Sequence, residues 1–145
     1  MIGLVQRVSS ASVRVGGEVV GAIDTGLLLL VCAEHGDTPA QALRLVDKVL
    51  ALRIFADDGG RMNRDLRQVG GGLLVVSQFT LAAELRGGNR PSFDGAAPYE
   101  TGRALYEEVL RLARERHAPV QAGVFGADMA VALVNDGPVT IPMKF

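Results

Sequence analysis

Residues 27–33 are LLLLVCA, and residues 38–52 follow as TPAQALRLVDKVLAL. An uninterrupted apolar run of the first kind is typical of a strand buried on both faces. In the second stretch Thr38 can cap a helix, Pro39 suits its first turn, and Gln41 completes a capping box. We therefore predict a buried strand followed by a helix that covers a sheet. The residues expected on the buried helix face are Leu43, Leu45, Val46, Val49, Leu50 and Leu52.

Further strands are predicted on both sides of this unit. Residues 2–15 are rich in β-branched types and end at Gly16-Gly17, a hairpin signal, after which residues 18–23 form the return strand. Two helices against a mostly β body indicate an α+β fold, which we assign to one domain spanning residues 1–145. The remaining predicted elements are strands over 53–55, 73–76, 120–124, 129–134 and 139–145, and a helix over 98–116.

Composition restricts the class of protein. The chain has 145 residues and a formal net charge of −1, so it has no broadly basic surface for nucleic acid. Cys32 is the single cysteine and cannot form a disulfide within the chain, which suits a reducing cytosol. The longest apolar run, residues 27–33, is far shorter than the ~20 residues that cross a bilayer. We expect a cytoplasmic protein with no membrane partner.

Metal and phosphate motifs are absent from the sequence. His35, His117 and Cys32 lack the spacing of a zinc site, and the acidic turn at residues 57–60 lacks the ligand pattern of a calcium loop. The glycines at 70–72 lack the Lys-Ser/Thr that completes a P-loop. We therefore predict no metal and no cofactor.

Two segments place polar groups where chemistry can occur. Ser77-Gln78-Phe79-Thr80-Leu81 directly follows a buried strand, so its backbone N–H groups and side chains can surround an oxyanion. An ordinary strand end with turn hydrogen bonds is the alternative. Asn135-Asp136-Gly137-Pro138-Val139-Thr140 interrupts two apolar strands, and from spacing alone a turn with a trans Gly-Pro bond is favoured.

A third segment is a glycine-rich loop with two arginines. Arg86 and Arg90 lie in the stretch RGGNRPSF, residues 86–93, and can contact phosphate groups. A solvated loop without a ligand is the alternative interpretation.

Taken together, these motifs resemble the D-aminoacyl-tRNA deacylase family in order and in spacing, over essentially the whole chain. The resemblance implies a β-barrel-like mixed sheet with two main helices, and a tight homodimer. It also implies that Gly137-Pro138 is a cis pair that each subunit inserts into its partner's active site. The matching stretches are residues 6–8, 10–13, 52–55, 77–81, 88–93, 125–129 and 135–140.

The resemblance further implies an activity, the hydrolysis of the ester of D-aminoacyl-tRNA. Ser77, Gln78, Phe79 and Thr80 would be the catalytic residues, with backbone N–H groups around Phe79 and Thr80 stabilising the oxyanion. The terminal ribose 2′-OH would help to position or activate water. Two alternatives stay open: Thr80 as a covalent nucleophile, and a non-catalytic module that holds tRNA 3′ ends.

Stereochemical selection would work by exclusion. The carbonyls of Gly137 and Pro138 would leave no space for an L side chain, so glycine would not be rejected and glycyl-tRNA(Ala) would also be cleaved. Arg7 would fix the Gly-Pro segment and Met129 would pack beside the substrate. The expected partners are tRNA and a second copy of the chain, and not DNA. Relatives commonly carry an aromatic and another basic residue in the loop at 82–87, so tRNA contacts there would be weaker in this chain.

Overall fold

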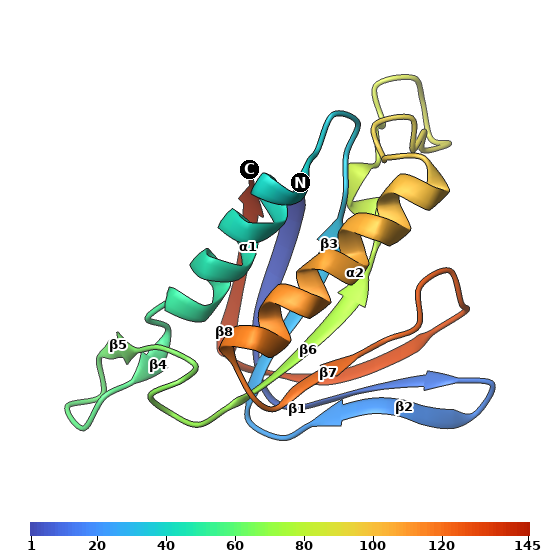
Figure 1. The fold of residues 1–145 in the computed structure, drawn as a ribbon. Coiled ribbons are helices and arrows are strands. Elements are labelled where there is room, and N and C mark those ends of the chain that lie inside the picture. Colours follow the sequence, from blue (N-terminus) through green and yellow to red (C-terminus); the bar gives the residue numbers. More distant parts are fainter.

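A curved sheet of six strands forms the body of the protein, and two helices lie side by side over one face of it (Figure 1). The computed structural model describes residues 1–145. The strand order is β2-β1-β3-β6-β7 with β8 also paired to β1, and β4 and β5 form a separate ribbon. The bounds are β1 Ile2–Val15, β2 Glu18–Ile23, β3 Gly26–Cys32, α1 Pro39–Ala51, β4 Phe55–Ala56, β5 Met62–Arg64, β6 Gly72–Ser77, the 3-10 turn η1 Phe79–Ala82, α2 Tyr99–Arg116, β7 Val120–Ala122 and β8 Ala130–Lys144.

The two ends of the sheet approach each other, so the sheet nearly closes into a barrel. Gly21 of β2 lies so near β7 that a Cβ atom on it would stand 2.7 Å from the Ala122 carbonyl oxygen. The β3–β6 and β6–β7 pairs are parallel, and the pairs that β1 makes are antiparallel. The predicted α+β fold with a barrel-like mixed sheet and two helices is confirmed.

The central strands β3 and β6 are buried on both faces, as the apolar run at 27–33 predicted. Leu27 and Leu73 belong to the core between the sheet and the helices. Leu28 and Leu74 belong to a second core on the concave side of the sheet, which Met129 also contacts. A fully buried leucine contributes roughly 1.5–3 kcal/mol, so these strands are the most firmly held part of the fold.

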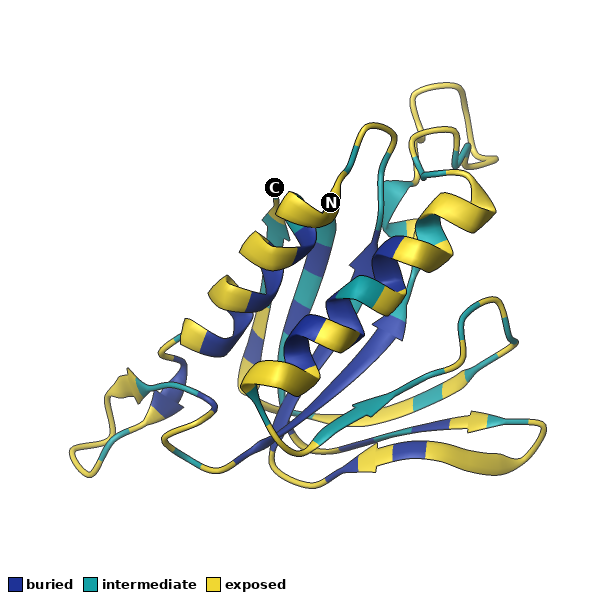
Figure 2. Cartoon of the chain, viewed as in Figure 1, coloured by how far each residue is buried: buried dark blue, intermediate teal, exposed yellow.

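Helix α1 begins as predicted. The Thr38 hydroxyl accepts a hydrogen bond from the Ala40 N–H, and the Gln41 side chain accepts one from the Thr38 N–H. The predicted apolar face is wrong at one position, since Leu43 is 37% exposed and Ala42 is buried in its place. Figure 2 shows the same division along both helices, with buried residues toward the sheet and exposed residues outward.

Two strand predictions need correction. Residues 129–134 and 139–145 were expected as separate strands, but β8 runs as one strand from Ala130 to Lys144. It continues because β1 is long enough to pair with it on both sides of residue 137. The short strand expected at 53–55 lies at Phe55–Ala56 and pairs with β5, which was not predicted.

Neither helix has the length and apolar character that a membrane crossing requires.

Candidate active site

The polar segment after β6 forms a tight turn at the end of a buried strand. The Gln78 N–H donates to the Val31 carbonyl at 2.7 Å, which continues the parallel pairing with β3. The 3-10 turn η1 starts at Phe79. The first N–H groups of a helical turn have no acceptor within that turn, so those of Phe79 and Thr80 are available to an oxygen atom of a ligand.

A buried thiol supports this turn from the core side. The Cys32 Sγ lies 3.3 Å from the Ala33 carbonyl oxygen and 3.5 Å from the Phe79 carbonyl oxygen, and its single S–H is shared between these two acceptors. Burial, and next the nearby Glu34 carboxylate, raise the pKa of the thiol, so it stays protonated and keeps its donor. Because the C=O and N–H of one trans peptide point in opposite directions, a carbonyl held toward Cys32 directs the Thr80 N–H away from the core.

A hollow of about 280 Å³ opens beside the turn. The predicted residues Ser77, Gln78, Phe79 and Met129 line it, together with Val76, Gly126, Ala127, Asp128 and Val131. The structure therefore brings four of the predicted site residues together. Asp128 lay in a motif that the sequence analysis singled out, but it received no role there.

Thr80 stands beside this hollow and is not part of its lining. Its exposed hydroxyl oxygen accepts a hydrogen bond from the Gln78 side-chain amide. An amide donor cannot remove the proton of a hydroxyl, so this contact does not activate Thr80 as a nucleophile.

A second hollow, of about 440 Å³, adjoins the first and shares Ser77, Phe79 and Gly126 with it. Its walls carry two edge-to-face aromatic pairs. Phe79 and Phe93 have ring centroids 5.1 Å apart, and Tyr99 and Phe125 have centroids 5.2 Å apart. Phe93 and Phe125 belong to motifs noted in the sequence, whereas nothing in the sequence marked Tyr99. The arrangement places four aromatic rings next to the polar turn.

The interruption of β8 lies against the side chain of Arg7. Arg7 Nε lies 3.2 Å from both the carbonyl and a carboxylate oxygen of Asp136, and Nη1 donates to the Ile54 carbonyl. Gly137 has φ +102°, and a Cβ atom there would lie 2.1 Å from Arg7 Nη2. Only glycine suits this position, because the backbone has a left-handed φ here and the Arg7 guanidinium leaves no space for a side chain.

The expected cis bond between Gly137 and Pro138 is not found. The single cis peptide bond of the chain is Ala118-Pro119, and the Gly137-Pro138 bond is trans. The positive φ of Gly137 accommodates the extra residues of β8 within a trans backbone, and β8 resumes its pairing with β1 in the same direction at Thr140. The trans turn, which was favoured from spacing alone, is therefore the form that this chain adopts.

Gly137 and Pro138 do not meet the turn at 77–80 within one chain. Val131 of β8 lines the first hollow, and Gly137 stands six residues farther along the same strand. At about 3.3 Å per residue the separation is roughly 20 Å. Neither Gly137 nor Pro138 lines the two hollows beside the 77–80 turn of its own chain.

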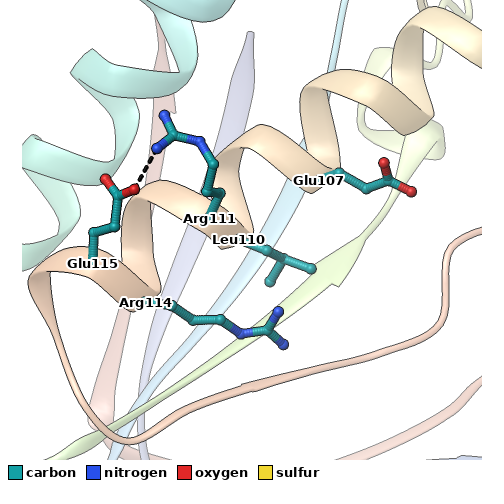
Figure 3. Close-up of a pocket in the computed structure, with 5 residues that line it drawn as sticks. All are labelled: Glu107, Leu110, Arg111, Arg114 and Glu115. Atoms are coloured by element: carbon teal, nitrogen blue, oxygen red, sulfur yellow. Dashed lines mark hydrogen bonds and ion pairs between the residues drawn. The ribbon is translucent and has the colours of Figure 1, made fainter.

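A further hollow, of about 410 Å³, lies on α2, and Figure 3 shows the five residues that line it. Leu110 is the single apolar residue among them, beside Glu107, Arg111, Arg114 and Glu115. Arg111 pairs with Glu115 one helical turn away. Exposed pairs of this kind are well solvated and contribute little to stability. This hollow is a charged helix surface and has no lining residue in common with the first two.

No group of three or more His, Cys, Asp or Glu side chains is arranged to hold a metal ion. Asp128 is the one titratable side chain in the lining of the first hollow.

Solved structures of similar shape define the class of fold. The chain superposes on a structure titled "c-Myc DNA Unwinding Element Binding Protein" with a TM-score of 0.95 and 39% identity, covering 100% of this chain and 99% of that one. It superposes on one titled "Structural Analysis of a probable eukaryotic D-amino acid tRNA deacylase" with a TM-score of 0.81 and 16% identity, covering 98% and 97%. At 16% identity the second likeness shows the fold alone.

The sequence comparisons show the family. The chain belongs to the D-Tyr-tRNA(Tyr) deacylase family, whose model matches residues 4–144. It is 65% identical to a D-aminoacyl-tRNA deacylase of Methylibium petroleiphilum over 143 residues, which are 99% of this chain and 94% of that one. It is 64% identical to a D-aminoacyl-tRNA deacylase of an Azoarcus species over 144 residues, which are 99% and 95%. The resemblance inferred from the motifs is confirmed.

Proposed function

We propose that this protein hydrolyses the ester that joins a D-amino acid to the 3′ end of tRNA, releasing both products. One observation carries the proposal: the turn after β6 offers the N–H groups of Phe79 and Thr80 beside a hollow of about 280 Å³. Membership of the deacylase family and the names of the relatives support the same reaction.

In the proposed reaction water attacks the ester carbonyl, and the resulting oxyanion accepts hydrogen bonds from the Phe79 and Thr80 N–H groups. One such donor lowers the barrier by ~3 kcal/mol. Ser77 and Gln78 orient the substrate from the same turn. The 2′-OH of the terminal ribose positions or activates the water, and Asp128 is the one titratable side chain in the lining of the hollow.

The aromatic hollow suits the terminal base of the tRNA. Unpaired bases are held by stacking on aromatic side chains, and Phe93, Tyr99 and Phe125 lie within reach of the polar turn. Arg86 and Arg90, on the loop that leads to Phe93, supply charges for the phosphates that follow. Arg86 is paired with Glu84, so it would exchange that partner for a phosphate oxygen.

Stereochemical selection in this proposal needs a homodimer. Gly137 and Pro138 of one subunit would face the 77–80 turn of the other, and their carbonyls would occupy the space of an L side chain. Exposed aliphatic side chains on the two strands that flank β1 favour a second copy as the partner, because such groups gain from burial. They are Val19 and Val20 on β2, and Leu133 and Val134 on β8, each 36% exposed or more.

Exclusion by backbone has two consequences. A D side chain points toward solvent, so the enzyme would accept many D-amino acids. Glycine has no side chain to exclude, so glycyl-tRNA(Ala) would be cleaved as well. We also propose that the protein acts in the cytoplasm, where aminoacyl-tRNA is found, and that the 2′-OH directs it to RNA and not to DNA.

The test compares D-Tyr-tRNA and L-Tyr-tRNA as substrates, with a chelator present, for the wild type and Thr80→Ala. We expect the D ester to be cleaved at least about a hundredfold faster, since a steric clash of ~3 kcal/mol has that effect. Thr80→Ala should keep most of the activity. Equal rates on both esters would contradict the proposal.

The covalent alternative predicts a different outcome for the same variant. Loss of all activity in Thr80→Ala, together with an acyl-enzyme trapped by rapid quenching of the wild type, would favour Thr80 as the nucleophile. Binding of tRNA without turnover by either protein would favour a holding module.

A further inference from the structure

β8 leaves its hydrogen-bonded ladder with β1 around residue 137. Gln6 is paired with Thr140 and Val8 with Asn135, so residues 136–139 stand opposite Arg7 alone. A bulge of this kind breaks the regular exchange of backbone hydrogen bonds and leaves carbonyl groups on both strands without their ladder donors. Something other than the ladder has to hold the base of the bulge together.

The side chain of Asn135 supplies the missing donors. Its Nδ2 donates to the Arg7 carbonyl on β1 at 3.0 Å and to the Val139 carbonyl on β8 at 3.0 Å. An asparagine amide has two N–H donors, and both are used here on backbone oxygens at opposite sides of the bulge. Val139 is buried in the main core, so the amide connects the bulge to a fixed point.

The carbonyl oxygen of the same amide extends the network. Asn135 Oδ1 accepts from the Thr140 hydroxyl at 3.4 Å, and that hydroxyl oxygen accepts from Gln6 Nε2 at 3.1 Å. Arg7 meanwhile holds the tip of the bulge through Asp136. The bulge is therefore held at its tip by a guanidinium and at its base by an amide.

We infer that Asn135 is a positioning residue for stereochemical selection, which sets where Gly137 and Pro138 stand without touching the substrate. The inference rests on the proposed function, in which these two residues exclude L side chains. Aspartate has the same shape as asparagine but lacks the two donors, and it would set a negative charge against two carbonyl oxygens. Asn135→Asp therefore removes the bridge with almost no change in volume.

The experiment measures kcat/KM for D-Tyr-tRNA and L-Tyr-tRNA with the wild type, Asn135→Asp and Asn135→Ala. Asn63→Asp is the matched control, because it makes the same chemical change at an exposed position of β5. We expect the D-over-L ratio to fall about thirtyfold in both Asn135 variants, as two lost hydrogen bonds would produce. The ratio of Asn63→Asp should stay at the wild-type value.

The ratio is the deciding measurement, since a purely structural role would lower both rates together and leave it unchanged. Folded Asn135 variants with the wild-type ratio would overturn the inference and leave the proposed function intact. A wild type that cleaves D-Tyr-tRNA and L-Tyr-tRNA at equal rates would contradict both the inference and the proposed function.

A second measurement covers the case in which the variants do not fold. The two Asn135 side-chain amide protons should exchange with solvent at least about tenfold more slowly than those of Asn63 in the wild type, because both are donated to backbone carbonyls. Equal exchange at the two asparagines would overturn the inference without any variant.

Discussion

Regular strand structure is interrupted in two regions, the turn after β6 and the bulge of β8. The two regions are held in place by different kinds of contact. The turn after β6 stands on residues 73–76, which are almost fully buried, and its hydrogen bond to Val31 is backbone to backbone. The bulge of β8 stands on a largely exposed strand and is held by the side chains of Arg7 and Asn135. The first is thus fixed by the core, and the second by a few polar contacts.

We therefore expect the two regions to differ in how well they tolerate side-chain substitutions. Backbone N–H groups at the end of a buried strand keep their direction through most side-chain substitutions, which suits the stabilisation of an oxyanion. A bulge held by side chains depends on each of them, so single substitutions should move it.

Gly137→Val should have the largest effect. A valine would need a left-handed backbone, which costs roughly 1–2 kcal/mol. Its Cβ would also lie 2.1 Å from Arg7 Nη2 and displace that side chain. We expect the D-over-L ratio of kcat/KM to fall by about a hundredfold or more. Gly16→Val is the control, since Gly16 also has a positive φ but has open space around it. A similar fall of the D-over-L ratio in Gly137→Val and Gly16→Val would show that selection does not depend on the bulge in particular.

Tyr106 tests the rigidity of the first region through pH. Its hydroxyl donates to the Val75 carbonyl at 3.0 Å, two residues before Ser77, and burial raises its pKa from 10.0 to about 12. The folded state therefore favours the protonated phenol. Ionising this buried phenol removes roughly 2–3 kcal/mol of stability; the loss is absent below pH 10 and grows as the pH rises from 10 to about 12.

Urea unfolding of the wild type, Tyr106→Phe and Tyr99→Phe at pH 7.5 and at pH 11.5 would measure this contribution. Tyr106→Phe should be about 1 kcal/mol less stable at neutral pH, because a hydrogen bond is lost, but it should lose less stability at alkaline pH. Tyr99 is 60% exposed, so Tyr99→Phe should keep the wild-type alkaline loss. An identical alkaline loss in all three proteins would contradict the raised pKa of Tyr106, and equal stability of Tyr106→Phe and the wild type at pH 7.5 would contradict its role in holding β6.

The arginines of the loop before Phe93 should give the smallest effect. Arg86 is 89% exposed at its side chain, and Arg90 has no ion-pair partner. Arg86→Ala and Arg90→Ala should each raise KM for the tRNA substrate about two- to threefold, with kcat nearly unchanged. The salt dependence of KM should weaken by roughly one phosphate contact for each variant. Arg61→Ala, on the β4–β5 ribbon, should change neither quantity if that ribbon lies outside the tRNA contact.

Local signals in the sequence were sufficient for part of this picture. The cap at Thr38, the two-sided burial of residues 27–33 and the polar turn at 77–81 depend on neighbours along the chain, and all three were predicted. Leu43 was misplaced because the apolar face of α1 is narrower than its leucines suggested. The continuity of β8 depends on the length of its partner β1, which no pattern within residues 129–145 reveals.

The sequence also identified only part of the candidate site. The residues of the turn could be named from sequence, because the strand before them fixes their place. The aromatic hollow could not, because Phe93 and Phe125 meet Tyr99 only after the loop, α2 and the segment after β7 are assembled. The resemblance also implied a cis bond at Gly137-Pro138, whereas the positive φ of Gly137 makes the turn with a trans bond in this chain.

The roughly 20 Å between the bulge of β8 and the hollow of the same chain has a genetic consequence under the proposed dimer. A defect in the turn and a defect in the bulge would belong to different halves of each working site. Two damaged alleles, one of each kind, would then rescue each other when expressed together, because a mixed pair rebuilds one intact site from the sound half of each chain.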